Sequence, residues 1–175
     1  LLVTDDPISI LSQLFKPKQE SRVDIVRLAF HSAQVDAAIA TGNWLKEFGY
    51  EIGLNLMQVA CISEIELRQV AQKVSEHCEP LVFYVADSTG SLVPDQITHI
   101  VETLRSVADV PVGVHMHDNL GLAIQNSLAA VAAGASFVDS TITGMGRGPG
   151  NAQTELVICE PDLVKSEEVD PFGLL

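Results

Sequence analysis

The sequence predicts an α/β fold, a (β/α)8 TIM barrel of which about six βα units are present. Short apolar runs alternate with amphipathic stretches, which indicates parallel strands joined by helices. From Val23 onward the runs start about 30 residues apart or slightly less, the length of one strand, one helix and two loops. No GxGxxG motif or Walker loop follows the early strands, which disfavours the doubly wound nucleotide-binding sheets.

Six apolar runs are expected to form the strands. They are residues 1–4, 23–30, 51–60, 81–86, 112–117 and 137–143. The runs are nearly continuous in hydrophobicity, a pattern typical of a parallel sheet that is covered on both faces.

The segments between these runs have helical spacing and helix end signals. The expected helices are 8–15, 34–48, 63–77, 94–107 and 120–133, with a weaker one near Asn151. Ser63 is a plausible N-cap, Pro94 suits a first helical turn, and Gly49 and Gly134 follow two helix ends. We therefore expect residues 1–158 to form a partial TIM-barrel catalytic domain.

Residues 159–175 fit neither a strand nor a helix. They are acidic, contain Pro161 and Pro171, and lack a clear period, so they are either an irregular tail or a junction across missing residues. Because the chain begins at Leu1, we expect it to be preceded by further residues in the natural protein.

The composition excludes several classes of partner and compartment. The 175 residues include 10 basic and 23 acidic ones, and the resulting net charge of −13 repels nucleic acid and anionic membranes. Cys61, Cys78 and Cys159 lie far apart without a CxxC pair, which favours a reducing, cytoplasmic location. No apolar run approaches the roughly 20 residues that cross a bilayer, and no basic-then-apolar leader precedes the first run.

His115 and His117 carry the strongest chemical signal. In a barrel, catalytic groups gather at the C-terminal ends of the strands, where this pair is expected. Two residues apart on a strand, both imidazoles share a face while Met116 points to the other. Paired imidazoles can bind one divalent ion, whereas a structural His pair is the alternative. The position at a strand end favours the metal.

Two histidines do not complete a metal site. A carboxylate normally joins such a pair, but Asp118 has the wrong parity to share the face of His117. Asn151, in the loop after the next strand, is the best oxygen donor in the chain. It is also a plausible helix N-cap, and the two roles are compatible.

Three further residues are candidates for substrate binding. Asp87 and Ser88 end a strand, where they form a turn and helix cap or hold a substrate carboxylate through the Ser88 hydroxyl and backbone N–H groups. Arg27 lies within a strand and needs a partner, either an anionic substrate or a structural ion pair. The glycine-rich loop 144–150 suits close approach to a ligand or simply sharp turns.

Two segments resemble a known family. They read VGVHMHDNLGLAIQNSLAA over residues 112–130 and VDSTITGMGRGPGNA over residues 138–152. They resemble the metal-dependent TIM-barrel lyase and synthase superfamily (HMG-CoA lyase-like), which includes hydroxymethylglutaryl-CoA lyase, isopropylmalate synthase and 4-hydroxy-2-oxovalerate aldolase. The aldolase branch looks closest, because residues 1–3, 26–29 with His31, and 84–88 echo its pattern.

The resemblance implies roles for several residues. His115 and His117 are expected to bind Mn²⁺ or Mg²⁺, Asn151 matches a ligand position, and Ser88 matches a position that holds the carboxylate of a 2-oxo acid. The family's enolate-stabilising Arg, its metal-binding Asp and its acid/base groups lie on the first strand. If residues 1–4 form strand 3, strands 3 to 8 are present and the catalytic residues cannot be named in this chain. The loop around Arg147 lacks the cysteine expected of hydroxymethylglutaryl-CoA lyase.

The expected function is that of a divalent-metal-dependent aldolase, a carbon–carbon lyase. It would cleave a 4-hydroxy-2-oxo acid, such as 4-hydroxy-2-oxovalerate, to pyruvate and an aldehyde through a metal-stabilised enolate. Two alternatives are a Claisen-type acyl-CoA/2-oxo acid synthase of the isopropylmalate synthase type and a non-catalytic barrel remnant. The expected partner is a small 2-oxo acid, and a homodimer is expected from the resemblance alone.

Overall fold

Five parallel strands form one sheet in the order β1-β2-β3-β4-β5. The structure is a computed structural model that describes residues 7–163, so the expected strand at 1–4 and the segment 164–175 lie outside the described residues. The strands are β1 Ile25–Phe30, β2 Glu51–Leu56, β3 Val82–Asp87, β4 Val112–Met116 and β5 Phe137–Val138. Strands that follow one another in sequence are also neighbours in the sheet, as in a barrel, and the order does not reverse as in a doubly wound sheet.

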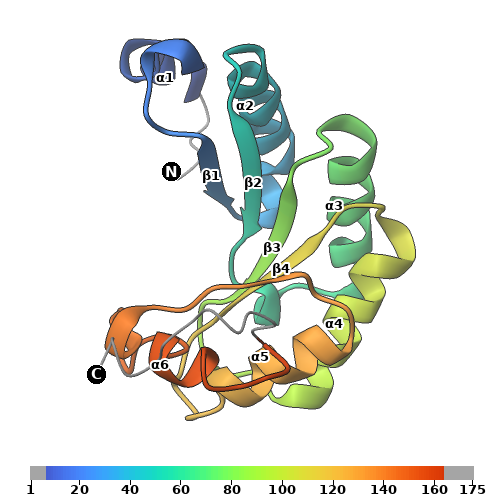
Figure 1. Cartoon of the computed structure of the whole chain (residues 1–175). Coiled ribbons are helices and arrows are strands. Elements are labelled where there is room, and N and C mark those ends of the chain that lie inside the picture. Colours follow the sequence, from blue (N-terminus) through green and yellow to red (C-terminus); the bar gives the residue numbers. More distant parts are fainter. Residues whose placement is uncertain (1–6, 164–175) are drawn as a thin grey trace.

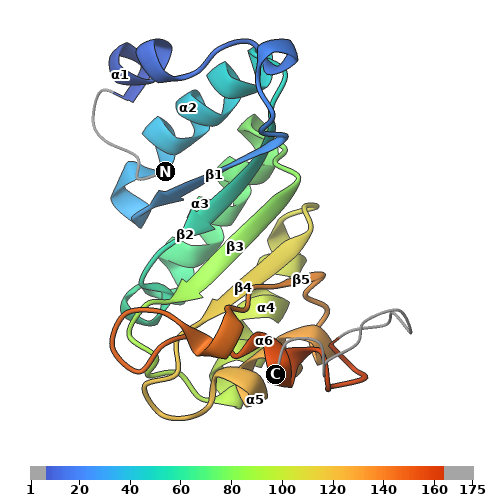
Figure 2. The same cartoon turned by 60° about the vertical axis from the view of Figure 1, so that its left-hand side comes forward.

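Helices connect the strands and form a layer on one face of the sheet (Figure 1). They are α2 Val35–Glu47, α3 Glu64–His77, α4 Pro94–Val107 and α5 Ala123–Ala132. Helix α1 Pro7–Leu14 precedes β1 and α6 Thr154–Val157 follows β5, and the 3₁₀ turns are η1 Lys18–Glu20, η2 Ser32–Gln34, η3 Val59–Cys61 and η4 Ile142–Gly144. Figure 2 shows α3 and α4 behind the strands. The expectation that both faces are covered is therefore wrong for the described residues, because the second face turns toward the inside of the barrel. None of the helices within residues 7–163 combines the length and hydrophobicity needed to cross a membrane.

The core lies between the sheet and its helices. Alternate strand residues point to this side and are buried, among them Leu28, Phe30, Leu54, Leu56, Phe83, Val85, Val114 and Met116. The rings of Phe30 and Phe83 stack with their centroids 6.5 Å apart. Removal of these side chains from water is the main favourable contribution to folding. Because side chains alternate along a strand, it also places the intervening residues on the face without helices.

Local signals place most helix starts correctly. The Ser63 hydroxyl accepts a hydrogen bond from the Glu66 N–H at 3.3 Å, which confirms the predicted N-cap of α3. Helix α5 starts at Ala123, later than predicted, because a turn forms first. Gly121 N–H donates to the Asp118 carbonyl at 3.0 Å, and the Asp118 carboxylate accepts from Ala123 N–H at 2.9 Å.

The last strand is much shorter than the predicted run 137–143. Phe137 and Val138 pair with β4, and the N–H of Asp139 still donates to the Val114 carbonyl at 2.9 Å. Beyond that point the chain leaves the sheet, and Thr141 pairs through an isolated bridge with Gln153. The rest of the predicted strand thus folds back onto the C-terminal segment.

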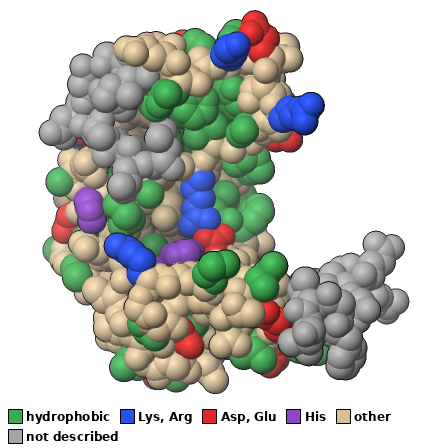
Figure 3. Space-filling view, turned by 90° about the vertical axis from the view of Figure 1, so that its left-hand side faces the viewer, with side chains coloured by type: hydrophobic (Ala, Val, Ile, Leu, Met, Phe, Trp, Pro, Cys, Tyr) green, Lys and Arg blue, Asp and Glu red, His purple; other side chains and the backbone are tan. Residues whose placement is uncertain are grey.

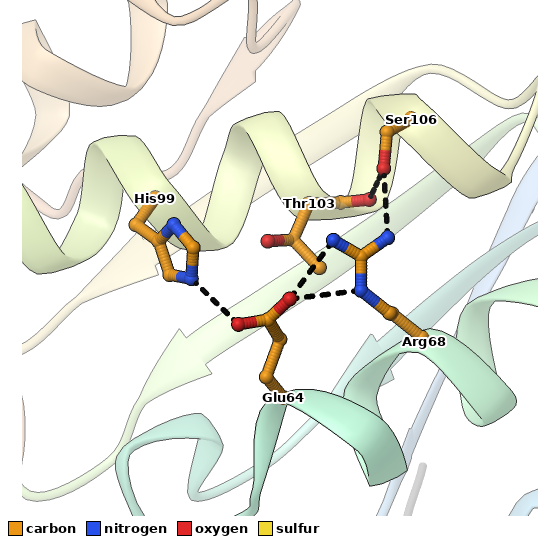
Figure 4. A network of polar contacts seen from close by, with 5 residues as sticks. All are labelled: Glu64, Arg68, His99, Thr103 and Ser106. Carbon is orange, nitrogen blue, oxygen red and sulfur yellow. Dashed lines mark hydrogen bonds and ion pairs between the residues drawn. The ribbon is translucent and has the colours of Figure 1, made fainter.

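A polar network joins α3 to α4 on the outside of the fold (Figure 4). The Glu64 carboxylate accepts from Arg68 Nε at 2.9 Å and lies 3.0 Å from His99 Nε2, while Arg68 donates to the Ser106 hydroxyl at 3.1 Å. The hydrogen bonds from His99 and Arg68 lower the pKa of Glu64. A cavity of about 420 Å³ lies beside this network, and none of the predicted site residues lines it.

We predict that Gly113→Ala destabilises the sheet by about 1–3 kcal/mol. A Cβ at Gly113 would lie 2.5 Å from the Tyr84 ring, so the ring would have to move. Gly53→Ala is the matched control, because its Cβ would meet no side chain closer than 3.5 Å. Urea unfolding of both variants tests the difference. Equal midpoints would contradict the tight packing of Tyr84 on Gly113.

Candidate metal and substrate site

The two histidines lie side by side where β4 ends. His115 is the fourth residue of β4, and His117 follows the strand directly. Their ring centroids are 5.2 Å apart and the ring planes are inclined by 78°. Met116, between them, is buried on the helix side of the sheet. The two-residue spacing therefore places both imidazoles on the face away from the helices, as predicted.

Asn151 joins the histidine pair from the loop after β5. Its backbone pairs with that of His117 in an antiparallel bridge. Its side chain is 7% exposed, and its Nδ2 donates to the Met145 carbonyl at 3.0 Å. Its Oδ1 is buried and accepts no hydrogen bond within the described part of the chain. A buried oxygen without a partner is costly, so this atom is suited to a ligand.

Asp139 is a site residue that the sequence analysis did not identify. One oxygen of its carboxylate lies 2.8 Å from His115 Nδ1 and also forms an ion pair with the Arg27 guanidinium. Burial alone would raise the pKa of Asp139, but the hydrogen bond from His115 and the charge of Arg27 outweigh it, so the pKa lies below its usual value. The strand spacing could have identified Asp139, because it comes two residues after Phe137 and its side chain therefore lies on the same face.

Arg27 crosses the open face of the sheet to reach Asp139. Its guanidinium carbon lies 3.9 Å from the centroid of the Tyr84 ring, and its side chain passes over Gly53, where a Cβ would lie 3.6 Å from the Arg27 Cγ. Arg27 belongs to β1 and Asp139 follows β5, the two ends of the strand order. In a flat sheet these strands would be about 19 Å apart, so the ion pair requires a strongly curved sheet.

The curved face gathers the charged groups of the site. Figure 3 looks onto this face, where basic, acidic and histidine side chains meet in a hollow bordered by apolar side chains. Arg27 therefore has the structural ion pair that the sequence allowed, and its predicted contact with a substrate stays a prediction. Burial and the nearby Asp139 carboxylate raise the pKa of the Tyr84 phenol, which keeps that group neutral.

Asp87 and Ser88 lie at the end of β3 in different surroundings. Asp87 is fully buried, and its carboxylate accepts from the Thr89 hydroxyl at 3.1 Å and from the Leu92 N–H at 2.9 Å. Its oxygens thus support the turn before α4. The Ser88 hydroxyl oxygen accepts from the Gln58 N–H at 3.0 Å, which leaves its proton for another acceptor. Ser88 is the better placed of the two to contact a ligand.

The glycine-rich loop packs tightly on Asn151. A Cβ at Gly146 would lie 2.3 Å from the Asn151 amide nitrogen, and one at Gly150 would lie 2.0 Å from the Gly144 carbonyl oxygen. Gly150 also has a φ of +96°, which side chains other than glycine rarely adopt. Close approach and backbone conformation both require glycine here.

The residues present fit part of the ligand set of a divalent ion. His115 directs its Nδ1 proton to Asp139, which leaves the lone pair of Nε2 for a metal. The His117 ring centroid lies 5.2 Å from that of His115, and the backbone bridge to His117 brings in Asn151, whose Oδ1 has no partner among the described residues. Within residues 7–163 no group of three or more His, Cys, Asp or Glu side chains could hold a metal. The described residues therefore supply two imidazoles and one amide oxygen, all neutral.

We predict that Asp139→Asn allows the neutral His115 ring to adopt both tautomers, whereas the wild type holds one. The carboxylate accepts the Nδ1 proton, whereas an amide at this position can also donate. In the metal-free protein, at a pH where the imidazoles are neutral, ¹⁵N NMR should show the His115 proton on Nδ1 in the wild type and a mixture of tautomers in the variant. An unchanged pattern of ¹⁵N shifts would rule out a positioning role for Asp139.

We also predict that His117 of the metal-free protein titrates below the usual value of about 6.5. Burial lowers its pKa most, and the charges of His115 and Arg147 add to this effect. The unfolded chain then binds this proton more readily than the folded one, so protonation of His117 reduces stability as the pH falls below about 6.5. An NMR titration, with His117→Gln to assign the signal, measures the pKa. A midpoint at or above the usual value would refute the prediction.

Comparisons with known proteins show which family the chain is similar to. The family model described as HMGL-like matches residues 21–166. The chain is 37% identical over 139 residues to the 4-hydroxy-2-oxovalerate aldolase of Pelotomaculum thermopropionicum, covering 79% of the chain and 41% of that protein. It is 38% identical over 136 residues to the protein of the same name from Geobacillus genomosp. 3, covering 78% and 40%. The chain thus spans about two fifths of the length of these curated relatives.

A solved structure supports the fold. The HMG-CoA lyase of Bacillus subtilis superposes with a TM-score of 0.80 at 17% identity, over 99% of this chain and 65% of the lyase. Together with the strand order, this likeness confirms the barrel prediction for the part of the fold that is described. Since the family model covers most of the chain, the chain belongs to the HMGL-like family.

Proposed function

We propose that this chain forms part of a metal-dependent aldolase that cleaves a 4-hydroxy-2-oxo acid, such as 4-hydroxy-2-oxovalerate, to pyruvate and an aldehyde. The names of the curated relatives support this reaction. The structural observation that carries the proposal is the unpartnered Asn151 oxygen beside two imidazoles at the C-terminal end of β4. A buried acceptor next to two further lone-pair donors is an arrangement suited to a cation.

His115, His117 and Asn151 would hold the ion, and Ser88 would hold the substrate carboxylate. Mn²⁺ or Mg²⁺, when bound, supplies Lewis-acid polarisation of the 2-oxo group. Asp139 keeps the Nδ1 of His115 protonated and so directs Nε2 into the site. Ser88 is fixed by the Gln58 N–H and can donate its proton to the carboxylate.

Cleavage breaks the C3–C4 bond of the substrate. A base takes the proton of the 4-hydroxyl, and C4 becomes the carbonyl carbon of the aldehyde. The electron pair of the broken bond passes to C3 and the 2-oxo oxygen, and protonation at C3 then gives pyruvate. The described residues contribute substrate binding and ligand orientation to this reaction. The expected homodimer and cytoplasmic location stay predictions.

We predict that His115→Ala/His117→Ala lowers pyruvate formation about a hundredfold or more, because both imidazole ligands are lost. The assay uses the intact protein with 4-hydroxy-2-oxopentanoate and Mn²⁺, coupled to lactate dehydrogenase, and metal content is measured on the same samples. His99→Ala is the matched control, since His99 belongs to α4 in the helix layer and its side chain contacts Glu64 of α3. Its activity should stay within about twofold of the wild type.

Other outcomes would separate the alternatives. Bound metal without pyruvate, together with thiol release from acetyl-CoA and a 2-oxo acid, would favour the Claisen-type synthase. Wild-type protein that binds no divalent metal would contradict the proposal and indicate that the histidine pair is structural.

A further inference from the structure

Arg147 is an exposed cation beside the site that the proposed function does not use. It lies in the glycine-rich loop between Gly146 and Gly148. The chain carries a net charge of −13, and most of its described basic side chains bind acidic groups or backbone carbonyls. Within residues 7–163, Arg147 has no carboxylate within ion-pair distance. Its charge is therefore available for an anion from outside these residues.

The loop holds Arg147 close to the histidines. Gly146, its neighbour, packs directly on the Asn151 side chain. The Gly150 N–H donates to the Arg147 carbonyl at 3.1 Å, and the Gly150 carbonyl accepts from the N–H of Asp118, the residue after His117, at 3.0 Å. The backbone around Arg147 is thus held by contacts with Asn151 and with the segment that carries His117. The charge of Arg147 also contributes to the lowered pKa of His117.

The strand order places two recognition groups on opposite sides of the histidines. Ser88 follows β3, the histidines end β4, and Arg147 follows β5, with β4 between the other two strands. A 2-oxo acid whose carboxylate binds Ser88 and whose 2-oxo group lies at the histidines therefore extends its other end toward Arg147. In a 4-hydroxy-2-oxo acid, that end becomes the aldehyde.

We infer that Arg147 binds a second anionic group on the aldehyde-derived end of the substrate, a carboxylate or a phosphate. This inference rests on the proposed function and predicts a preference within its substrate class: 4-hydroxy-2-oxo acids with a second anionic end are bound more tightly than 4-hydroxy-2-oxovalerate. A guanidinium forms paired hydrogen bonds with either anion, which favours Arg over a neutral residue at this position. A Cβ at Gly148 would meet no atom within 4 Å, so an anion has room to approach the loop next to Arg147. The aldehyde product then carries the same negative charge.

The binding of two uncleavable 2-oxo acids tests this inference. 2-Oxoglutarate and 2-oxopentanoate have five carbons each, lack the 4-hydroxyl, and differ in a terminal carboxylate against a methyl group. In the intact protein with Mn²⁺, calorimetry should give a Kd for 2-oxoglutarate about ten- to a hundredfold below that for 2-oxopentanoate. Arg147→Gln should remove this preference and leave the Kd for 2-oxopentanoate within about twofold.

Arg22→Gln is the matched control. It removes the same charge from an exposed residue that precedes β1, at the opposite end of the strands from the site. The control should keep the wild-type preference, because Arg22 lies too far from the site to contact the terminal anion and its charge is screened there. If both variants lose the preference to the same degree, it reflects the overall field of the protein and the inference is wrong.

Cleavage rates distinguish a terminal carboxylate from a terminal phosphate. They also separate a failure of the Arg147 inference from a failure of the proposed aldolase activity. The kcat/KM for 2-oxo-3-deoxy-6-phosphogluconate against its dephosphorylated parent tests the phosphate. The kcat/KM for 4-hydroxy-2-oxoglutarate against 4-hydroxy-2-oxopentanoate tests the carboxylate. A preference for either anionic substrate that Arg147→Gln abolishes supports the inference. Equal binding and cleavage of charged and neutral substrates overturns it while the aldolase stands, and no binding of any 2-oxo acid overturns the proposed function itself.

Discussion

The ion pair between Arg27 and Asp139 is the interaction on which the rest of the site depends. It links the first and last strands of the sheet across the face that carries no helices. The Arg27 side chain passes over Gly53, and its guanidinium carbon lies 3.9 Å from the centroid of the Tyr84 ring, which supports it. The same Asp139 oxygen bonds to His115. A single carboxylate therefore joins the two ends of the curved sheet and orients one candidate metal ligand.

This pair is buried enough to be worth more than an ordinary surface ion pair. The Arg27 and Asp139 side chains are 33% and 20% exposed, and each has further partners that satisfy it. Burial of an unpaired charge would be costly, whereas a carboxylate with two hydrogen-bond donors retains its charge. Loss of Asp139 would thus leave the Arg27 charge without its ion-pair partner and His115 without orientation, so its effects on folding and on the site are coupled.

Much of the fold and part of the site follow from local sequence. The alternation in β4 fixes the helix side for Met116 and the open side for His115, because a one-residue shift would bury an imidazole in the apolar core. Ser63 marks a helix start through the hydrogen bond it accepts from Glu66, three residues on, and Pro94 marks one through its fixed φ. Such features need no knowledge of distant segments, which is why they can be predicted.

The remaining features depend on contacts between distant segments. The sequence does not show that the Asp139 carboxylate meets Arg27, or that the Asp87 oxygens are occupied by their own turn. The short β5 is a similar case, because the pairing of Thr141 with Gln153 competes with the sheet. Asp118 is the carboxylate nearest to His117 in sequence, yet it accepts a hydrogen bond from the backbone N–H of Ala123. Neighbours in the fold, rather than in the chain, decide these roles.

The consecutive strand order has a consequence for the kinetics of folding. Each strand pairs with the next one along the chain, so most of the sheet can assemble through short loop closures. The contact between Arg27 and Asp139 joins the two ends of this series and closes the longest loop. It is expected to form after the transition state, in which case its loss accelerates unfolding and leaves the folding rate almost unchanged. The unfolding arm of a chevron plot for Arg27→Met would display this asymmetry, and the pair would then determine how long the curved sheet persists once formed.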